Sequence, residues 1–388
     1  MARPAPALNR INAATTIMND RLTLSYTPAL DGLRAIAIVA VMIYHASPSL
    51  MPGGFAGVEL FFVLSGFLIT GLLLREQQCH GRIHLGFFYA RRVLRLLPAL
   101  LLMLTIVTTF AWCVLPAGFG SRTLTDALLA LGYCVNWARA FDMRGASLLG
   151  HTWSLSIEEQ FYVLWPITLI LLVKRTGNSR SLTRVLGLSA AVAVIYRILM
   201  LTGGASGVRL YNGLDTRADG LLLGCALAAA LSSGVIDLSR PSVRRVIQRA
   251  TPWAIIGCCW AIWSLSWQQV RTYIWGLPLV SLCTAVLICS VLLTPDSRLS
   301  RVLTSRPLVW IGQLSYGLYL WHYPVYRIMS QMGASQFQCL TLGTAITVFA
   351  AALSWHLVEK PLLHLKKHFQ LGTSNTPHER TPTIAPAT

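Results

Sequence analysis

One apolar helix carries an arginine and a histidine, Arg34 and His45, separated by three helical turns of hydrophobic sequence. At about 100° per residue, eleven steps return to nearly the same face of a helix, about 16 Å further along its axis. Ionisable side chains inside a membrane span are costly, and they are tolerated where they face a protein interior or a wet cavity. The pair therefore predicts a functional site within the membrane.

A second group of candidates lies in the segment 151–162, where helical spacing aligns Ser154, Glu158 and Tyr162 on one stripe. The distribution of Lys and Arg along the chain predicts an orientation that places this stripe near the outer surface, in the same half of the membrane as His45. An imidazole and a carboxylate from different helices could meet there and deprotonate a hydroxyl group.

Three arginines, Arg91, Arg92 and Arg95, gather at the opposite membrane face. Arg92 and Arg95 are one helical turn apart and could offer forked donors to a phosphate group. Basic residues at the cytoplasmic end of a span are also expected for topology alone, and that reading stays open. Arg34 lies deeper in the membrane and is not explained as a topology signal.

Several further polar residues fall in or beside apolar runs. They are Asp31, Glu59, Ser65, His151, Asp215, Arg217, Asp219, Tyr319 and His322. For each of them a structural role is the alternative to a functional one: Glu59 could bond a neighbouring helix, and Ser65-Gly66 could be a close-packing contact. An ion-pair cluster that fixes its span is favoured over direct chemistry for the 215–219 group.

The composition defines the class of protein. Hydrophobic residues make up 54% of the 388 residues and charged residues only 12%, which excludes an ordinary soluble enzyme. Apolar runs of about 20 residues predict an all-α, polytopic membrane protein of about ten transmembrane helices. The predicted spans lie near 32–48, 55–74, 97–116, 152–173, 184–202, 216–233, 252–270, 273–293, 308–329 and 338–357.

The basic residues predict the orientation. With ten spans both termini share a side, and 23 of the 32 Lys and Arg residues fall on that side, against six on the other. Because Lys and Arg favour cytoplasmic loops, we expect cytoplasmic N- and C-termini. The net charge of +18 is explained by this excess of basic residues in cytoplasmic loops, where they are attracted to anionic lipid. No nucleic-acid partner is therefore expected.

The expected organisation is a single membrane domain. We predict a cytoplasmic N-terminal segment over 1–28, the transmembrane domain over 29–361 and a disordered cytoplasmic tail over 362–388. The N-terminal segment lacks the pattern of a cleavable signal, so the first span should remain in the mature chain. The nine cysteines show no metal-ligand spacing, and no metal is expected.

The ordered motifs resemble the acyltransferase-3 family of membrane proteins that O-acylate cell-surface glycans. The matching segments are Asp31-Gly-Leu-Arg34 with His45, 57–68, Arg92-x-x-Arg95-x-x-Pro98, 151–162, 215–224, 315–324 and Val358-Glu-Lys-Pro361. Some family members carry an extra hydrolase-like domain after the membrane region. Fewer than thirty residues follow Pro361 here, so we expect acceptor recognition in the membrane domain, its outer loops or a separate protein.

The resemblance implies a ten-helix fold in the cell inner (cytoplasmic) membrane and transfer of an acyl group, usually acetyl from acetyl-CoA. The acceptor is a hydroxyl of an extracytoplasmic carbohydrate such as O-antigen, exopolysaccharide or another glycan, either free or as a lipid-linked sugar. The implied catalytic residues are His45, Glu158, Glu159 and Tyr162, and the implied acyl-CoA site contains Arg34, Arg92 and Arg95. We predict that Glu158 or Glu159 orients His45, which accepts the proton of the attacking hydroxyl.

Three alternatives stay open at this stage. The transfer could proceed directly or through an acyl-imidazole on His45. The acceptor could be a small metabolite or a lipid. The chain could also be a membrane carrier in which the same buried charges form a relay without acyl transfer.

Overall fold

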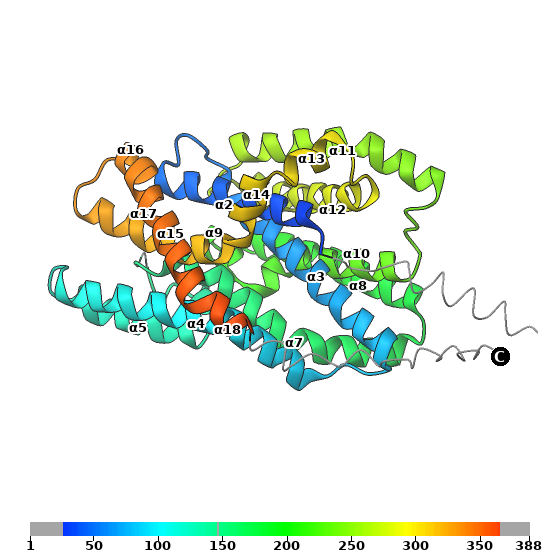
Figure 1. The fold of residues 1–388 in the computed structure, drawn as a ribbon, viewed down its shortest axis with the longest axis horizontal. Helices are drawn as coiled ribbons and strands as arrows, with labels where there is room; N and C mark the ends of the chain where they lie inside the picture. Colours follow the sequence, from blue (N-terminus) through cyan, green and yellow to red (C-terminus); the bar gives the residue numbers. More distant parts are fainter. Residues whose placement is uncertain (1–25, 146, 365–388) are drawn as a thin grey trace, which may run out of the picture.

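The computed structural model describes residues 26–145 and 147–364, which form helices joined by short loops and contain no strand. Most of the predicted segments 1–28 and 362–388 lies outside the described residues. The chain is therefore an all-helical membrane protein, as the composition predicts. The long helices run roughly along the long axis of the molecule (Figure 1), with α4 (Leu85–Cys113) and α5 (Phe119–Leu131) on one side and α11 (Pro241–Ser264) on the other.

The other α-helices of the described residues complete the fold. They are α2 (Pro28–Ala46), α3 (Gly57–His80), α6 (Val135–Ala140), α7 (Trp153–Thr176), α8 (Ser179–Thr202), α9 (Gly207–Asn212), α10 (Leu214–Ser232), α12 (Leu277–Leu293), α13 (Arg298–Leu303), α14 (Arg306–Gln313), α15 (Ser315–Gln331), α16 (Gln336–Gln338), α17 (Thr344–Ser354) and α18 (Lys360–His364). A short 3-10 turn, η2 (Gly150–Thr152), leads into α7.

Helices occupy all ten predicted spans, but among the described residues only seven helical stretches are long and apolar enough to cross a membrane. The other three predicted spans correspond to α10, α11 and the α14–α15 pair. Helix α10 begins with three charged residues, α11 begins with a basic turn, and α15 is only 17 residues long. The predicted span 308–329 is divided at Leu314, where α14 ends and α15 begins.

Glycines allow the central helices to pack at backbone contact. A Cβ on Gly66 of α3 would lie 2.0 Å from the carbonyl oxygen of Leu221, and one on Gly224 of α10 would lie 2.1 Å from that of Val63. Small residues permit such close approach between membrane helices. Gly66 therefore serves the packing role proposed for the Ser65-Gly66 pair, and it leaves the neighbouring Ser65 side chain free to face another helix.

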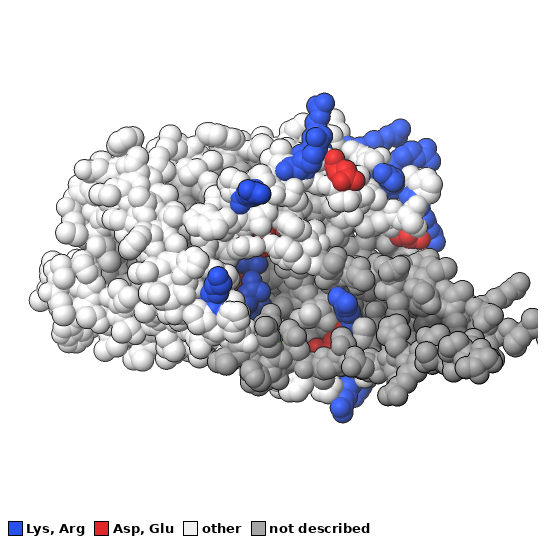
Figure 2. Space-filling model, in the orientation of Figure 1, with Lys and Arg blue, Asp and Glu red and all other residues white. Residues whose placement is uncertain are grey.

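The exposed Lys and Arg side chains are unevenly distributed. On the face shown in Figure 2 they lie over α11 and α13 and across the middle and right of the view, whereas the left end formed by α5 and α16 shows none. The positive-inside rule relies on an asymmetry of this kind.

Candidate active site

Three histidines from distant parts of the chain form one cluster. His45 ends α2, His322 lies in the middle of α15, and His151 lies in η2. The Nδ1 atom of His45 is 3.0 Å from Nε2 of His322. The ring of Tyr323 meets His45 edge-on at 5.0 Å and stacks on His151 at 5.0 Å. The aromatic ring and the two neighbouring imidazoles thus fix the orientation of His45.

The hydrogen bonds of His322 determine which nitrogen of His45 carries a proton. His322 Nδ1 is 3.0 Å from the carbonyl oxygen of Leu318, which can only accept, so Nδ1 donates. In a neutral ring Nε2 must then be an acceptor, and His45 Nδ1 donates to it. His45 Nε2 is therefore the unprotonated nitrogen of the ring. This is the state that a general base or nucleophile requires.

A cavity of about 360 Å³ lies between α2, α3, α4, α7 and α15. Its polar lining consists of Arg34, Ser65, Arg91, Arg92, Arg95, Ser154, Glu158, Glu159, Tyr162, Ser315, Tyr316 and Tyr319. We call this space the arginine cavity. Four guanidinium groups face two glutamates and the Glu76 that pairs with Arg91, so the cavity suits an anionic ligand.

Glu158 lies inside the arginine cavity. Its carboxylate accepts a hydrogen bond of 2.8 Å from the Ser65 hydroxyl, which in turn accepts one of 2.8 Å from Tyr162. The guanidinium of Arg92 lies 3.5 Å above the Tyr162 ring, and its Nε has no hydrogen-bond partner among the described residues. Because α7 turns its acidic face toward α3 and α4, the carboxylates meet buried cations in a medium of low dielectric constant.

Tyr319 separates the arginine cavity from the histidine cluster. Its hydroxyl lies 2.6 Å from Ser154 Oγ and donates to the carbonyl oxygen of His151 at 2.9 Å. Its ring lies 5.3 Å from that of His322. Along α15, Ser315 lines the cavity, Tyr319 follows one turn later, and His322 comes next. The two sites are therefore neighbours, with one tyrosine side chain between them.

A second cavity, of about 330 Å³, adjoins the first. The two share the side chains of Arg34, Leu68, Arg95 and Tyr316. Asp31 lines this second cavity and accepts a hydrogen bond of 2.8 Å from Tyr26. Arg34 donates through Nε to Ser315 at 3.2 Å. Arg34 and Arg95 thus lie between the two cavities and line both of them.

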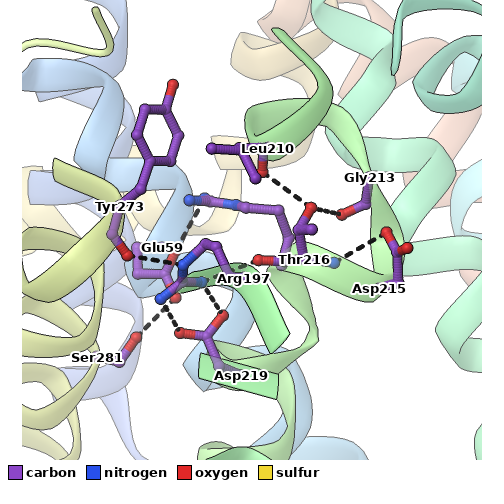
Figure 3. A network of polar contacts seen from close by, with 10 residues as sticks. Glu59, Arg197, Leu210, Gly213, Asp215, Thr216, Asp219, Tyr273 and Ser281 are labelled. Carbon is purple, nitrogen blue, oxygen red and sulfur yellow. Dashed lines mark hydrogen bonds and ion pairs between the residues drawn. The ribbon is translucent and has the colours of Figure 1, made fainter. Parts of the chain in front are cut away.

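A separate buried network joins α3, α8, α10 and α12 (Figure 3). Arg197 forms a bidentate pair with Asp219 at 2.6 and 3.0 Å. Glu59 pairs with Arg217 at 2.8 Å and accepts a hydrogen bond of 2.6 Å from Ser281. The guanidinium of Arg217 also lies near the rings of Phe62, Trp153 and Tyr211. This network links four helices and makes no contact with either cavity.

A family model described as "Acyltransferase domain", Acyl_transf_3, matches residues 27–359. This range covers nearly all the described residues. It includes the arginine cavity, the histidine cluster, the buried network and the second cavity apart from Tyr26 and Leu363. The chain belongs to the acyltransferase-3 family.

Several curated relatives are described as O-acetyltransferases, two of them as peptidoglycan O-acetyltransferases. The chain is 37% identical over 352 residues to the putative peptidoglycan O-acetyltransferase YrhL of Bacillus subtilis, covering 87% of this chain and 55% of that protein. It is 33% identical over 355 residues to the peptidoglycan O-acetyltransferase OatA of Listeria monocytogenes, covering 88% and 56%. It is also 33% identical to O-acetyltransferase OatA of Staphylococcus aureus, covering 87% and 57%.

The chain therefore spans little more than half the length of these acyltransferase-3 relatives. No solved structure matches it significantly.

The acyltransferase-3 structure changes one predicted pairing. His45 bonds His322, and neither Glu158 nor Glu159 contacts it, because both line the arginine cavity. The acidic residues of α7 that were expected beside His45 instead line the same cavity as Arg34, Arg92 and Arg95. From the sequence, these acidic and basic side chains were predicted at different depths in the membrane. Arg34 and His45 do project from α2 toward the same helix, α15, as their spacing predicts.

The other predicted residues fall into separate groups. Asp215 pairs with Arg209, away from Asp219 and Arg217, which belong to the buried network. Three residues of these clusters were not among the predicted site residues: Arg197, Tyr323 and Ser281. Arg197 carried a usable signal, since it is a charged residue in an otherwise apolar run. Nothing in the local sequence distinguishes the other two.

Proposed function

We propose that this chain is a membrane O-acetyltransferase that moves an acetyl group from cytoplasmic acetyl-CoA to a hydroxyl of an extracytoplasmic glycan. The observation that supports this most directly is the His45 imidazole, which His322 holds with its Nε2 unprotonated next to the arginine cavity. The names of the relatives support O-acetyl transfer to a cell-wall glycan. The basic surface at the α11 and α13 end supports a cytoplasmic location for that end in the inner membrane.

The donor enters through the second cavity in this proposal. Phosphate groups of acetyl-CoA bind Arg34 and Arg95, where the two cavities meet, and Arg92 contributes from the arginine cavity. The pantetheine arm then extends through the arginine cavity toward Tyr319. Movement of the Tyr319 side chain brings the thioester to the histidine cluster.

The transfer step uses His45 Nε2 as the base. The acceptor hydroxyl approaches the thioester carbonyl, and His45 takes its proton as the new carbon–oxygen bond forms. The carbon–sulfur bond breaks, and the CoA thiolate leaves and receives the proton from His45, which returns to its neutral form. His322 stabilises the protonated imidazole through the bond to Nδ1. Glu158 and Glu159 offset positive charge in the arginine cavity. Glu158 also accepts the hydrogen bond of Ser65, which in turn accepts one from Tyr162, so both hydroxyl groups are held in place.

The direct test is acetyl transfer in membranes that contain the chain. Labelled acetyl-CoA is supplied on the cytoplasmic side, and ester-linked label is measured in the surface glycan before and after mild alkali. Mass spectrometry of the glycan from cells with and without the chain should show the loss of an acetyl mass. Movement of acetyl-CoA or glycan without ester formation would instead indicate a carrier.

Replacing His322 with Phe should lower kcat about 10²-fold with little change in either KM, because His45 Nδ1 loses its acceptor and the tautomers are no longer fixed. His322→Gln keeps an acceptor and should retain activity within about tenfold of the parent. Steady-state kinetics of both variants, with equal amounts of folded protein, measure this. Equal losses in the two variants would show that His322 serves packing alone.

Replacing Arg34 or Arg95 with Gln should raise the KM for acetyl-CoA by about 10- to 100-fold, the loss of one charge-assisted hydrogen bond to phosphate. The KM for the acceptor should stay unchanged. The exposed Arg249 of α11 provides a matched control, since its replacement by Gln removes the same charge far from the cavities. Unchanged donor KM in both cavity variants would move the donor site elsewhere.

A further inference from the structure

Arg139 of α6 is a cation beside the histidine cluster that the proposed transfer step does not use. Its Nε donates to Asn212 Oδ1 at 3.1 Å, and the Asn212 amide nitrogen donates to the carbonyl oxygen of Val208 at 2.8 Å. Asn212 is buried and held at both ends. The Oδ1 atom of Asn212 therefore holds the guanidinium of Arg139 in one orientation.

The guanidinium of Arg139 keeps unused donors. Within the described part of the chain no carboxylate lies within ion-pair distance of it, whereas the neighbouring cations Arg209 and Arg144 pair with Asp215 and Asp126. Asp126 acts on Arg139 electrostatically but lies 3.5 Å from Arg144. A half-buried guanidinium with free forked donors matches a carboxylate ligand.

Gly150 leaves room for Arg139 to approach the histidine cluster. A Cβ at this position would lie 2.8 Å from Arg139 Nη1 and 3.4 Å from the hydroxyl oxygen of Tyr323. The Tyr323 ring is the one that contacts both His45 and His151. Arg139 therefore lies next to the cluster at the level of Tyr323, beyond Tyr319 and away from the arginine cavity.

This position separates Arg139 from the donor site. Arg34, Arg92 and Arg95 line the arginine cavity on one side of Tyr319, and Arg139 does not line it. An anion held by Arg139 would thus reach the histidine cluster beside Tyr323, from outside the arginine cavity that holds the thioester arm in the proposal. An acceptor must also approach from outside the space that the donor fills.

We propose that Arg139 binds a carboxylate of the acceptor, so that the acceptor is an acidic glycan whose sugar hydroxyl then faces His45. This inference rests on the proposed function and adds the chemical class of the acceptor to it. Asn212 and Gly150 are positioning elements that hold Arg139 in place, and Arg139 is the group that contacts the acceptor.

The test compares two acceptors that differ only in charge. One is a tetrasaccharide of alternating N-acetylglucosamine and N-acetylmuramic acid, and the other is the same molecule with its lactyl carboxylates reduced to alcohols. The parent chain should use the charged form at least tenfold better in kcat/KM. Arg139→Gln should lose at least tenfold on the charged form, mainly through acceptor KM, and should no longer distinguish the two. Arg139→Lys should keep part of the preference.

The controls separate this inference from the proposed function. Arg122→Gln removes an exposed arginine of the neighbouring α5 and should leave the preference intact. The KM for acetyl-CoA should be the same in all variants. A preference that survives in Arg139→Gln, or an equal loss on both acceptors, overturns the inference. So does a parent chain that acetylates neither tetrasaccharide while surface glycan is still acetylated in a His45-dependent manner, and in that case the proposed function stands.

Discussion

Replacing His45 with Ala is expected to lower the rate of acetyl transfer about 10³-fold, within the range that a positioned general base contributes. The substitution removes the nitrogen that accepts the proton of the attacking hydroxyl and leaves His322 without its partner. The loss should appear in kcat, with the KM for acetyl-CoA unchanged, because the arginine cavity does not include His45. Label incorporated from acetyl-CoA into glycan, per mole of purified folded protein, measures it.

A matched control is available in the same chain. His356 lies in the π-helical stretch Trp355–Glu359 near the C-terminal end of the described residues and is exposed, so His356→Ala should leave the rate unchanged. Both variants should insert into the membrane and elute from a sizing column in detergent as the parent does. Transfer that persists in His45→Ala at the parent rate would remove His45 from the mechanism.

Removing one member of the Glu59–Arg217 pair should have the largest effect on stability. Both side chains are fully buried, and Arg217 Nη2 lies 2.8 Å from Glu59 Oε2. In Glu59→Leu the Arg217 guanidinium stays buried without its counter-charge, and two of its nitrogens already lack hydrogen-bond partners. Breaking such a pair destabilises a protein by about 3–5 kcal/mol. Thermal unfolding in detergent should show a large fall in midpoint temperature.

The double variant Glu59→Leu/Arg217→Met distinguishes an unpaired charge from a general packing defect. Replacing both members with apolar groups is often neutral, so most of the lost stability should return. The partly buried Asp215–Arg209 pair is the comparison, and its loss in Asp215→Asn should cost less than the loss of the fully buried Glu59–Arg217 pair. If the double variant unfolds at the same temperature as Glu59→Leu, the network is important for packing and not for charge balance.

The sequence predicted those features that depend on local composition and spacing. Apolar runs gave the membrane class and the approximate positions of the helices, and the motif order gave the family. Helical periodicity also placed Arg34 and His45 on one face, and both meet α15. These predictions hold because each depends on a single helix in lipid, where backbone hydrogen bonds must be satisfied within the helix itself.

Contacts between helices were decided only by the tertiary structure. Periodicity fixes which residues share a face but not how far each helix is rotated about its axis, and in α7 that rotation turns Glu158 toward Ser65 and Arg92. Backbone contact at the glycines of α3 and α10 sets how the central helices pack. The partner of His45 therefore became His322, 277 residues away, because helix packing, which acts between distant segments, brought α2 and α15 together.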